Sequence, residues 1–237
     1  MKKCFIFFIP FVVVFFACSK ARCPVPASVP DSLSTSGTTG IQTNAYTITL
    51  QPGSEGKDAV IDSYSPTTNF GNTAFLAIEA WTQNGGFTRI QRSLLDFDYS
   101  PLPSGAIITS AVLTLYADTT SNYSAGSVPP GHSQLSGSNA WNLSRITSAW
   151  DEQTVTWNTM PGIDTTTTLS LPASDTASEP YSIDVTTFVK DQIAKPTSYY
   201  GFYMNLVTEI PYRAVYFYSS NGKYPTLHPT MVIGYIK

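Results

Sequence analysis

Apolar and polar residues alternate with a period of two along most of the chain beyond Ala45. Clear examples lie at residues 46–50, 111–116 and 230–235, where one side of an extended segment is apolar and the other is polar. Clusters of Gly, Pro and Asn separate about ten such runs. Many short strands in one unit predict an all-β fold. We expect an antiparallel β-sandwich of jelly-roll type over residues 45–237.

One segment shows helical spacing instead. Between residues 184 and 195 the apolar side chains recur every three or four positions, at Val185, Phe188, Val189 and Ile193. Asp184 is a suitable cap for the start of a helix, and Pro196 ends it. The pattern predicts one short helix, which we expect to lie across one edge of the sandwich.

The first residues form neither strand nor core. A basic start is followed by an apolar run that reaches Ala17 and is too short for the ~20 residues of a membrane-spanning helix, so residues 1–17 read as an export signal. The run ends in a segment that resembles a bacterial lipobox, which makes Cys18 the expected lipid-bearing N-terminus, with palmitate among its acyl groups. Residues 18–44 are rich in Ser, Thr and Pro, as in a flexible tether. We expect a lipoprotein on the bacterial cell surface, held at the outer membrane.

Composition excludes some classes of partner. The chain has 13 Lys and Arg against 16 Asp and Glu, and no basic cluster follows residue 3. A general nucleic-acid binder needs a dense basic surface, so we expect no nucleic-acid partner. Besides Cys18, only Cys23 would remain after export, so no disulfide framework is available to the domain.

Several short segments follow one another in a characteristic order, at residues 69–71, 92–98, 102–106, 110–116, 150–158, 183–186, 200–202 and 225–227. Together they resemble one family, the DNRLRE or disaggregatase-related domain. Asp96 departs from the basic or polar residue expected at its position. The family is similar to jelly-roll carbohydrate-binding modules, and some relatives bind acidic polysaccharides such as alginate. The resemblance therefore implies polysaccharide binding, with an acidic glycan among the expected ligands.

Aromatic residues supply the candidate ligand contacts. The segments at residues 199–207 and 214–219 are joined by a short connection, which suggests a hairpin. Alternation then places one ridge of side chains outward, Tyr203, Tyr216 and Tyr218, with Arg92 nearby to bind a uronic-acid carboxylate. Trp81 and Trp141 adjoin turn sequences, where exposed rings can stack on sugars. Ordinary cross-strand aromatic pairing is the alternative for the tyrosines.

The remaining candidates favour structure over chemistry. Trp150 and Trp157 belong to the family pattern, and we expect them to be packed anchors of a loop. His132 and His228 fall in no zinc or nucleophile motif, and the carboxylate pairs are Asp96 with Asp98 and Asp151 with Glu152. We expect no catalytic residue and no required cofactor. Asp58, Asp62 and Asp98 are weak candidates for a structural calcium ion.

Together these patterns predict a non-catalytic cell-surface lipoprotein whose domain binds polysaccharide. Two alternatives stay open: a polysaccharide lyase or glycosidase on the same fold, and a structural or adhesive surface protein without glycan affinity. The sequence does not name the sugar or any protein partner.

Overall fold

The computed structural model describes residues 44–53, 56–83, 86–120 and 131–237. These residues form twelve β-strands, one α-helix and two short 3-10 helices. The predicted export segment, Cys18 and the tether up to residue 43 lie outside the described residues. Within the described part of the chain, no helix is both long enough and apolar enough to cross a membrane.

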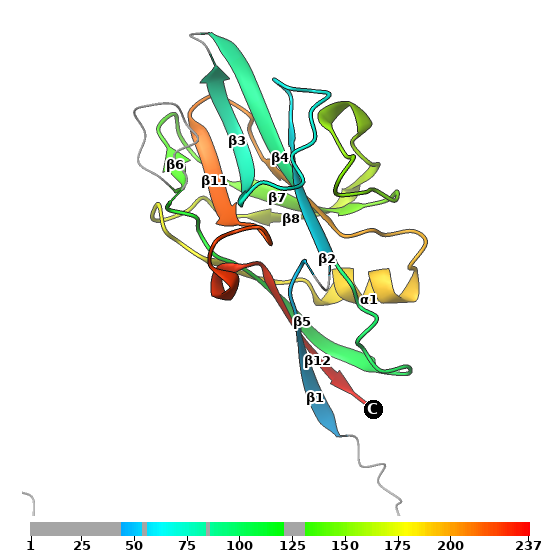
Figure 1. Ribbon diagram of the computed structural model, residues 1–237. Helices are drawn as coiled ribbons and strands as arrows, with labels where there is room; N and C mark the ends of the chain where they lie inside the picture. The colour runs from blue at the N-terminus through cyan, green and yellow to red at the C-terminus, as the bar shows by residue number, and fades with distance from the viewer. Residues whose placement is uncertain (1–43, 54–55, 84–85, 121–130) are drawn as a thin grey trace, which may run out of the picture. The chain divides into compact units, whose positions relative to one another are not determined.

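The smaller of two sheets joins the first and last strands of the domain. Its antiparallel strands, in spatial order, are β1 (Ala45–Leu50), β12 (Thr230–Ile236), β5 (Ile107–Leu115) and β9 (Tyr181–Asp184). The three segments with the clearest alternation therefore lie side by side, as Figure 1 shows for β1, β12 and β5. Met231 and Ile233 are buried while Val232 between them is exposed, as period two predicts.

The larger sheet is also antiparallel. Its path is β6 (Ser133–Gln134), β11 (Arg213–Tyr218), β3 (Phe75–Gln83), β4 (Phe87–Phe97), β10 (Phe202–Leu206), β7 (Trp141–Ile146) and β8 (Ile163–Leu171), with β2 (Gly56–Asp62) paired to β4. β4 is the longest strand, with eleven residues. It pairs with β3 near its start and with both β2 and β10 toward its end, so it is a central strand of the sheet.

The strand order confirms the predicted fold class. When β2, β3, β6 and β11 are set aside, the sheets read β1-β12-β5-β9 and β4-β10-β7-β8. The chain crosses between the two sheets at β1 to β4, β4 to β5, β5 to β7, β8 to β9, β9 to β10 and β10 to β12. This interleaving is the arrangement of a jelly roll. The protein is an all-β antiparallel sandwich.

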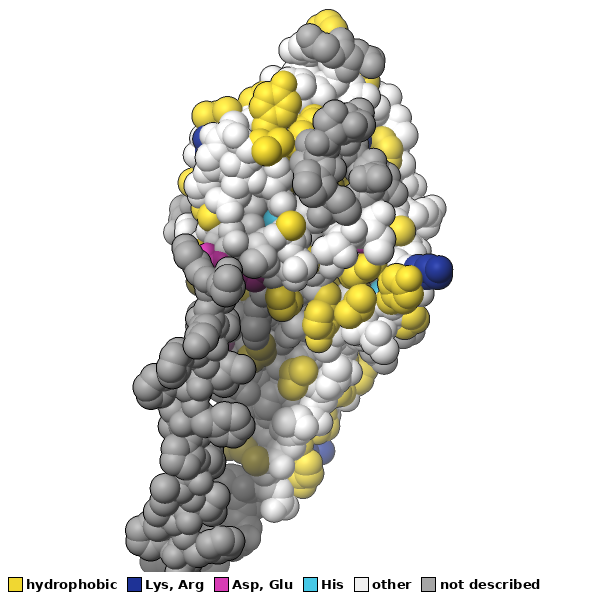
Figure 2. Space-filling view, turned by 90° about the vertical axis from the view of Figure 1, so that its left-hand side faces the viewer, with side chains coloured by type: hydrophobic (Ala, Val, Ile, Leu, Met, Phe, Trp, Pro, Cys, Tyr) yellow, Lys and Arg dark blue, Asp and Glu magenta, His cyan; other side chains and the backbone are white. Residues whose placement is uncertain are grey.

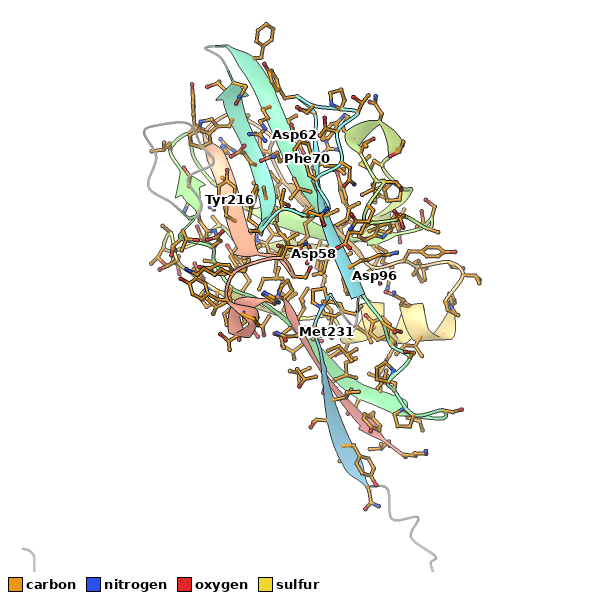
Figure 3. The ribbon with its side chains drawn as sticks, in the orientation of Figure 1. Asp58, Asp62, Phe70, Asp96, Tyr216 and Met231 are labelled. Atoms are coloured by element: carbon orange, nitrogen blue, oxygen red, sulfur yellow. The ribbon has the colours of Figure 1, made fainter. Side chains whose placement is uncertain are left out.

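The main core lies between the sheets. Leu113, Met231 and Ile233 from the smaller sheet belong to one buried cluster with Leu95, Phe97 and Met204 from the larger sheet. Figure 3 shows Met231 on β12, in the lower part of the view. Leu95 and Phe97 point into this core while Leu94 belongs to a different cluster, as alternation on the β4 segment predicts.

Two loops cover the other face of the larger sheet. Residues 147–162, between β7 and β8, bury Leu94 and Tyr203 under Trp150 and Val155. Residues 63–74, between β2 and β3, place Phe70 against a second cluster that contains Tyr216. The larger sheet is therefore packed on both faces, although its strands alternate as if one face met solvent.

The predicted helix is confirmed as α1 (Thr186–Ala194). The N-cap residue is Val185, which has no side-chain capping bond, so Asp184 stands one residue before the cap position expected for it. Its Oδ1 accepts hydrogen bonds from the Thr186 backbone N–H and hydroxyl at the start of the helix. Phe188 is buried and stacks on Phe202 of β10, at 6.1 Å between ring centroids. Because α1 also packs on β5, it bridges the two sheets.

The expected hairpin at residues 199–219 is wrong. β10 pairs with β4 and β7, whereas β11 pairs with β3 and β6. In the strand order of the sheet, the paired strands β3 and β4 stand between them. Tyr203 therefore does not form one ridge with Tyr216 and Tyr218.

Candidate functional site

The aromatic residues expected to face solvent are buried. Trp141 is fully buried in the main core, and the others are less than a tenth exposed: Trp81, Tyr203, Tyr216 and Tyr218. The predicted exposure is wrong: Trp141 lies in the core between the sheets, and the clusters under the two covering loops contain Tyr203 and Tyr216. The Trp81 ring packs against Tyr212, and the Tyr218 ring packs against Tyr224. Their contact with a sugar stays a prediction, and it would require these side chains to become accessible.

Arg92 lies next to Tyr203, as expected, but its guanidinium already holds a carboxylate. Nε and Nη2 donate to the two carboxylate oxygens of Glu209 at 2.8 and 2.9 Å. The guanidinium also lies 4.6 Å from the centroid of the Trp157 ring and 5.9 Å from that of Tyr203. The guanidinium group that we expected to bind a uronic acid is thus already paired with a carboxylate of the same chain.

Trp150 is a buried loop anchor, as predicted. Its indole N–H donates to the Tyr200 carbonyl at 2.9 Å, and Lys57 Nζ lies 4.5 Å from its ring centroid. Trp157 is partly buried against the same cluster. The Asn69 amide donates to the Glu152 and Val155 carbonyls, both at 2.8 Å, which ties the two covering loops together.

The three calcium candidates lie in separate bonding environments. Asp58 accepts from the Ser220 N–H at 2.7 Å, Asp62 binds Arg89 at 2.6 Å, and Asp98 accepts from the Ser100 N–H at 2.8 Å. Over the described ranges, no group of three or more His, Cys, Asp or Glu side chains is arranged to hold a metal ion. A structural calcium ion stays a prediction.

Two buried carboxyl groups have strongly altered acidity. Burial raises the pKa of Asp58 to about 7, and burial also raises the pKa of Glu79 to about 7. The Tyr216 hydroxyl donates to Glu79 Oε2, and Asp62 and Arg89 are its charged neighbours. Figure 3 shows Asp58 and Asp62 on β2 and Tyr216 on β11. These side chains are buried and are bonded to other groups of the chain.

The histidines have structural partners. His132 Nδ1 accepts from the Tyr216 N–H at 3.1 Å, and Nε2 lies 2.8 Å from the Glu179 carbonyl oxygen. Burial lowers the pKa of His132, which favours the neutral ring. His228 Nε2 lies 2.8 Å from the Gly222 carbonyl oxygen. Both rings therefore serve backbone hydrogen bonding.

A cleft of about 450 Å³ opens beside α1, facing the loop of residues 98–106 that follows β4. This volume is within the usual range of small-molecule sites. Its walls are apolar and aromatic side chains: Leu102, Pro103, Ile108, Ile193, Pro196, Tyr199 and Tyr200. Its polar groups come from Asp96, Asp98, Tyr99 and Gln192, with two serines on the loop. The cleft combines ring surface with a few hydrogen-bonding groups.

Asp96 stands at the inner side of this cleft. It lies near the end of β4, and Figure 3 shows it beside β2, next to α1. Its Oδ1 accepts from Gln192 Nε2 at 2.8 Å and from the Phe97 N–H at 3.0 Å. Oδ2 lies 3.9 Å from Lys57 Nζ. Burial raises the pKa of Asp96, against the opposing effects of Gln192 and Lys57.

The approach of β10 to Asp96 depends on Gly201. Its φ is 97°, a left-handed conformation that favours glycine. A Cβ at this position would lie 2.3 Å from the Leu95 carbonyl oxygen and 2.7 Å from Asp96 Cβ. The glycine in the segment at residues 200–202 therefore lets the tyrosine pair before it reach the cleft wall.

The Tyr99 hydroxyl is buried beside the cleft without a hydrogen-bond partner among the described residues. Burial, and then the charge of Asp96, raise the pKa of Tyr99, so the phenol stays protonated and able to donate. Buried hydroxyls are normally paired. Tyr99 is an exception to this rule within the described part of the chain.

The sequence contained parts of this site but not their assembly. The β4 segment places Asp96 on the face opposite Leu95, and residues 199 and 200 stand out as a tyrosine pair. Gln192 carries no sequence signal, because a polar residue on a helix is ordinary. The exposed side of Ile193, on the expected apolar face of α1, is the one sign that this helix borders an opening.

Exposed aromatic rings also occur outside the cleft. The exposed aromatic side chains of the described residues are Tyr46, Tyr64, Phe87, Tyr212 and Tyr224. The Tyr212 ring meets the edge of Trp81 at 5.2 Å, and Tyr224 meets Tyr218 at 5.9 Å. Figure 2 shows one face on which hydrophobic and uncharged side chains predominate and charged ones are sparse. These rings belong to different elements, whereas the cleft gathers several side chains around one space.

Comparison with known protein families identifies one family for the domain. The model of carbohydrate-binding module family 96 matches residues 50–234, a range that includes both walls of the cleft. A comparison with curated proteins finds no significant match. The narrower assignment to the DNRLRE domain stays a prediction. Because the family match covers well over half of the sequence, the chain belongs to carbohydrate-binding module family 96.

Proposed function

We propose that the domain binds polysaccharide without cleaving it, and that the cleft beside α1 is the binding site. The observation that carries the location is the concentration of tyrosine rings and convergent polar groups around one opening of about 450 Å³. Membership of a carbohydrate-binding module family supports the ligand class. The tyrosine rings predicted from strand alternation are buried, so they do not compete for this role.

The walls suit a sugar ring. The apolar C–H faces of a sugar pack on aromatic and aliphatic surfaces such as those of Tyr199, Ile193 and Leu102. The hydroxyl groups of the sugar need partners that accept and donate, which Asp96, Gln192 and Tyr99 supply. A contact of this size contributes little binding free energy once the cost of ordering the ligand and the side chains is subtracted. We expect dissociation constants of roughly micromolar to millimolar size.

Replacement of Tyr199 by Ala tests the location. Tyr199 lines the cleft from the loop after α1, so Tyr199→Ala should weaken glycan binding by about tenfold, the loss of ~1.4 kcal/mol of ring contact. The measurement is isothermal titration with the glycan that gives the strongest signal on a glycan array. Tyr224→Ala is the matched control, because Tyr224 is an exposed tyrosine outside the cleft. Equal loss in both variants, or in neither, would place the site elsewhere.

The absence of cleavage belongs to this proposal. His132, the histidine with both ring nitrogens near backbone partners, has no free nitrogen for proton transfer while those contacts hold. A lyase or glycosidase would release unsaturated products or new reducing ends from the bound polysaccharide. Assays for both on the array-positive glycan separate the enzyme from the binder. A protein with no array signal at all would be the structural or adhesive alternative.

An acidic polysaccharide is the narrower ligand expected from the sequence. It would bind at Arg92 only if the guanidinium left Glu209, because both carboxylate oxygens of Glu209 occupy the fork. Exchange of one carboxylate for another is chemically reasonable at a partly exposed ion pair. The acidic ligand therefore has a candidate place of its own, separate from the cleft.

Anchoring through Cys18 completes the proposed role. The apolar run that ends at Ala17 supports export, and the cysteine that follows supports lipid attachment. We expect Cys18→Ser to abolish incorporation of labelled fatty acid and to release the protein from the membrane fraction. Cys23→Ser is the matched control and should label like the parent. Labelling that persists in Cys18→Ser would contradict the anchor.

A further inference from the structure

We propose that the glycan site continues from the cleft across the smaller sheet, onto a stacked pair of tyrosines, Tyr46 and Tyr235. This surface takes further sugar units of the polysaccharide that occupies the cleft, so the domain selects long chains over short ones. The inference rests on the proposed binding of glycan beside α1. Both tyrosines lie outside residues 50–234, the range that the family model matches, so family membership does not imply this extension.

Strand register connects the cleft to the two tyrosines. Ile108 of β5 lines the cleft and is paired with Tyr235 of β12, which is paired in turn with Tyr46 of β1. Residues directly opposite one another in antiparallel strands project from the same face of the sheet. Because neighbouring strands lie about 4.8 Å apart, the row from Ile108 to Tyr46 extends the wall of the cleft by roughly 10 Å.

The row lies on the inner face of the smaller sheet, at the end of the core. Ile108 is buried in the main core, and Tyr235 packs against the same core while it is only partly buried. The register of β12 with β5 shifts between Gly234 and Tyr235, and this bulge keeps Ile108 opposite Tyr235. Figure 1 shows this end of the smaller sheet, where β1 begins and β12 ends, extending past the larger sheet toward the bottom of the view.

The ring pair presents a stacking surface at the edge of this sheet. The ring centroids of Tyr46 and Tyr235 lie 5.5 Å apart, and the ring planes meet at 23°. Tyr46 is 44% exposed, and its strand β1 stands at one end of the strand order. The apolar C–H face of a sugar packs on such an exposed ring, and the phenol hydroxyls can donate to the sugar or accept from it.

Cross-strand pairing alone would also bring two tyrosines together, and it would contribute only to stability. The position of the pair supports the glycan role, because the rings continue the row that begins in the cleft wall at Ile108. The two roles differ in one measurable property. Only a ligand contact makes the loss of the ring depend on the length of the bound sugar chain.

The test measures affinity against chain length, by NMR titration of the full chain. The probes are fragments of three and six sugar units from alginate, which is acidic, and from cellulose, which is neutral. If neither series binds, fragments of a glycan found on an array replace them. Tyr46→Ala should weaken binding of the hexamer by about fivefold, the contribution of one ring contact, and leave the trimer unchanged. Tyr46→Phe keeps the ring and should bind both fragments as the parent does.

Two further variants separate this surface from the cleft. Tyr224→Ala is the matched control, because Tyr224 is 43% exposed and also packs on a second tyrosine ring, outside the cleft. It should leave both affinities unchanged, whereas Tyr199→Ala in the cleft should weaken trimer and hexamer alike. If Tyr46→Ala lowers the melting temperature, Tyr46→Thr removes the ring with a residue that favours strands, and the same selective loss is expected.

Parent-like hexamer affinity in Tyr46→Ala, or an equal loss for trimer and hexamer, would overturn the extension and leave the cleft as the binding site. The surface has two other conceivable occupants, a second copy of the chain and a membrane. Loss of a dimer, or of binding to phosphatidylglycerol vesicles, with unchanged hexamer affinity would assign it to one of these and also overturn the extension. No binding of any fragment or array glycan by the parent would overturn the proposed function as well.

Discussion

Replacement of Trp141 by Ala should lower the free energy of unfolding by ~3–5 kcal/mol, because it removes the largest fully buried side chain of the main core. The Trp141 ring lies 5.4 Å from that of Tyr181 on the smaller sheet and 5.7 Å from that of Phe217 on β11. It therefore fills the space where the two sheets meet. The surrounding strands are hydrogen-bonded on both sides and have little freedom to collapse into the cavity.

Urea unfolding followed by circular dichroism measures this effect. Phe87→Ala is the control, because Phe87 is 69% exposed and its truncation should change the midpoint very little. A Trp141→Ala protein as stable as the parent would mean that the ring does not fill the core as described. Loss of glycan binding without loss of stability would instead restore Trp141 as a ligand contact, as the sequence suggested.

Stability should fall as the pH rises from about 5 to about 8. Asp58 and Glu79 have folded pKa values of about 7, above the ordinary values of 3.8 and 4.5 that they take in the unfolded chain. Between these values the folded protein binds more protons than the unfolded one. Each carboxyl then lowers the free energy of unfolding by about 1.4 kcal/mol per pH unit through this window. Their stabilising effect is fully present below pH 4 and is lost as the pH passes 7.

The double variant Asp58→Asn, Glu79→Gln isolates this contribution. Both amides keep an acceptor oxygen, for the Ser220 N–H and the Tyr216 hydroxyl respectively, but neither ionises. Unfolding free energies measured at pH 5, 6, 7 and 8 should vary less in the variant than in the parent. Burial lowers the pKa of His132, so this residue makes the protein more stable as the pH rises. The test is therefore the difference between parent and variant in the slope of unfolding free energy against pH. Parallel slopes in the two proteins would contradict the assignment.

Local pattern was sufficient for the individual elements. Period two identified the strands at residues 46–50, 111–116 and 230–235. The burial of Leu95 and Phe97 in the main core agrees with the same alternation on β4. Helical spacing, with Asp184 before it and Pro196 after it, identified α1. These features depend on backbone geometry and on neighbours within a few residues, so they are encoded locally.

Alternation failed where a third layer covered a sheet. It correctly placed Tyr203 and Tyr216 on the face opposite the main core, but it took that face to be solvent. Residues 63–74 and 147–162 pack on it instead, far from these tyrosines in sequence. Alternation along a strand shows which residues share a face of the sheet. It does not show whether a loop distant in sequence covers that face.

The sequence by itself therefore determined the class of fold, its strands and its helix, and the family resemblance that points to carbohydrate. Tertiary structure alone decided which rings are buried, which partner holds Arg92, and where an opening remains. The cleft joins Asp96 and the loop after β4 to Gln192 and Tyr199, which are about a hundred residues away along the chain. Such a site exists only once α1 has packed on β5 and β10, because contacts between distant segments form only when the chain folds.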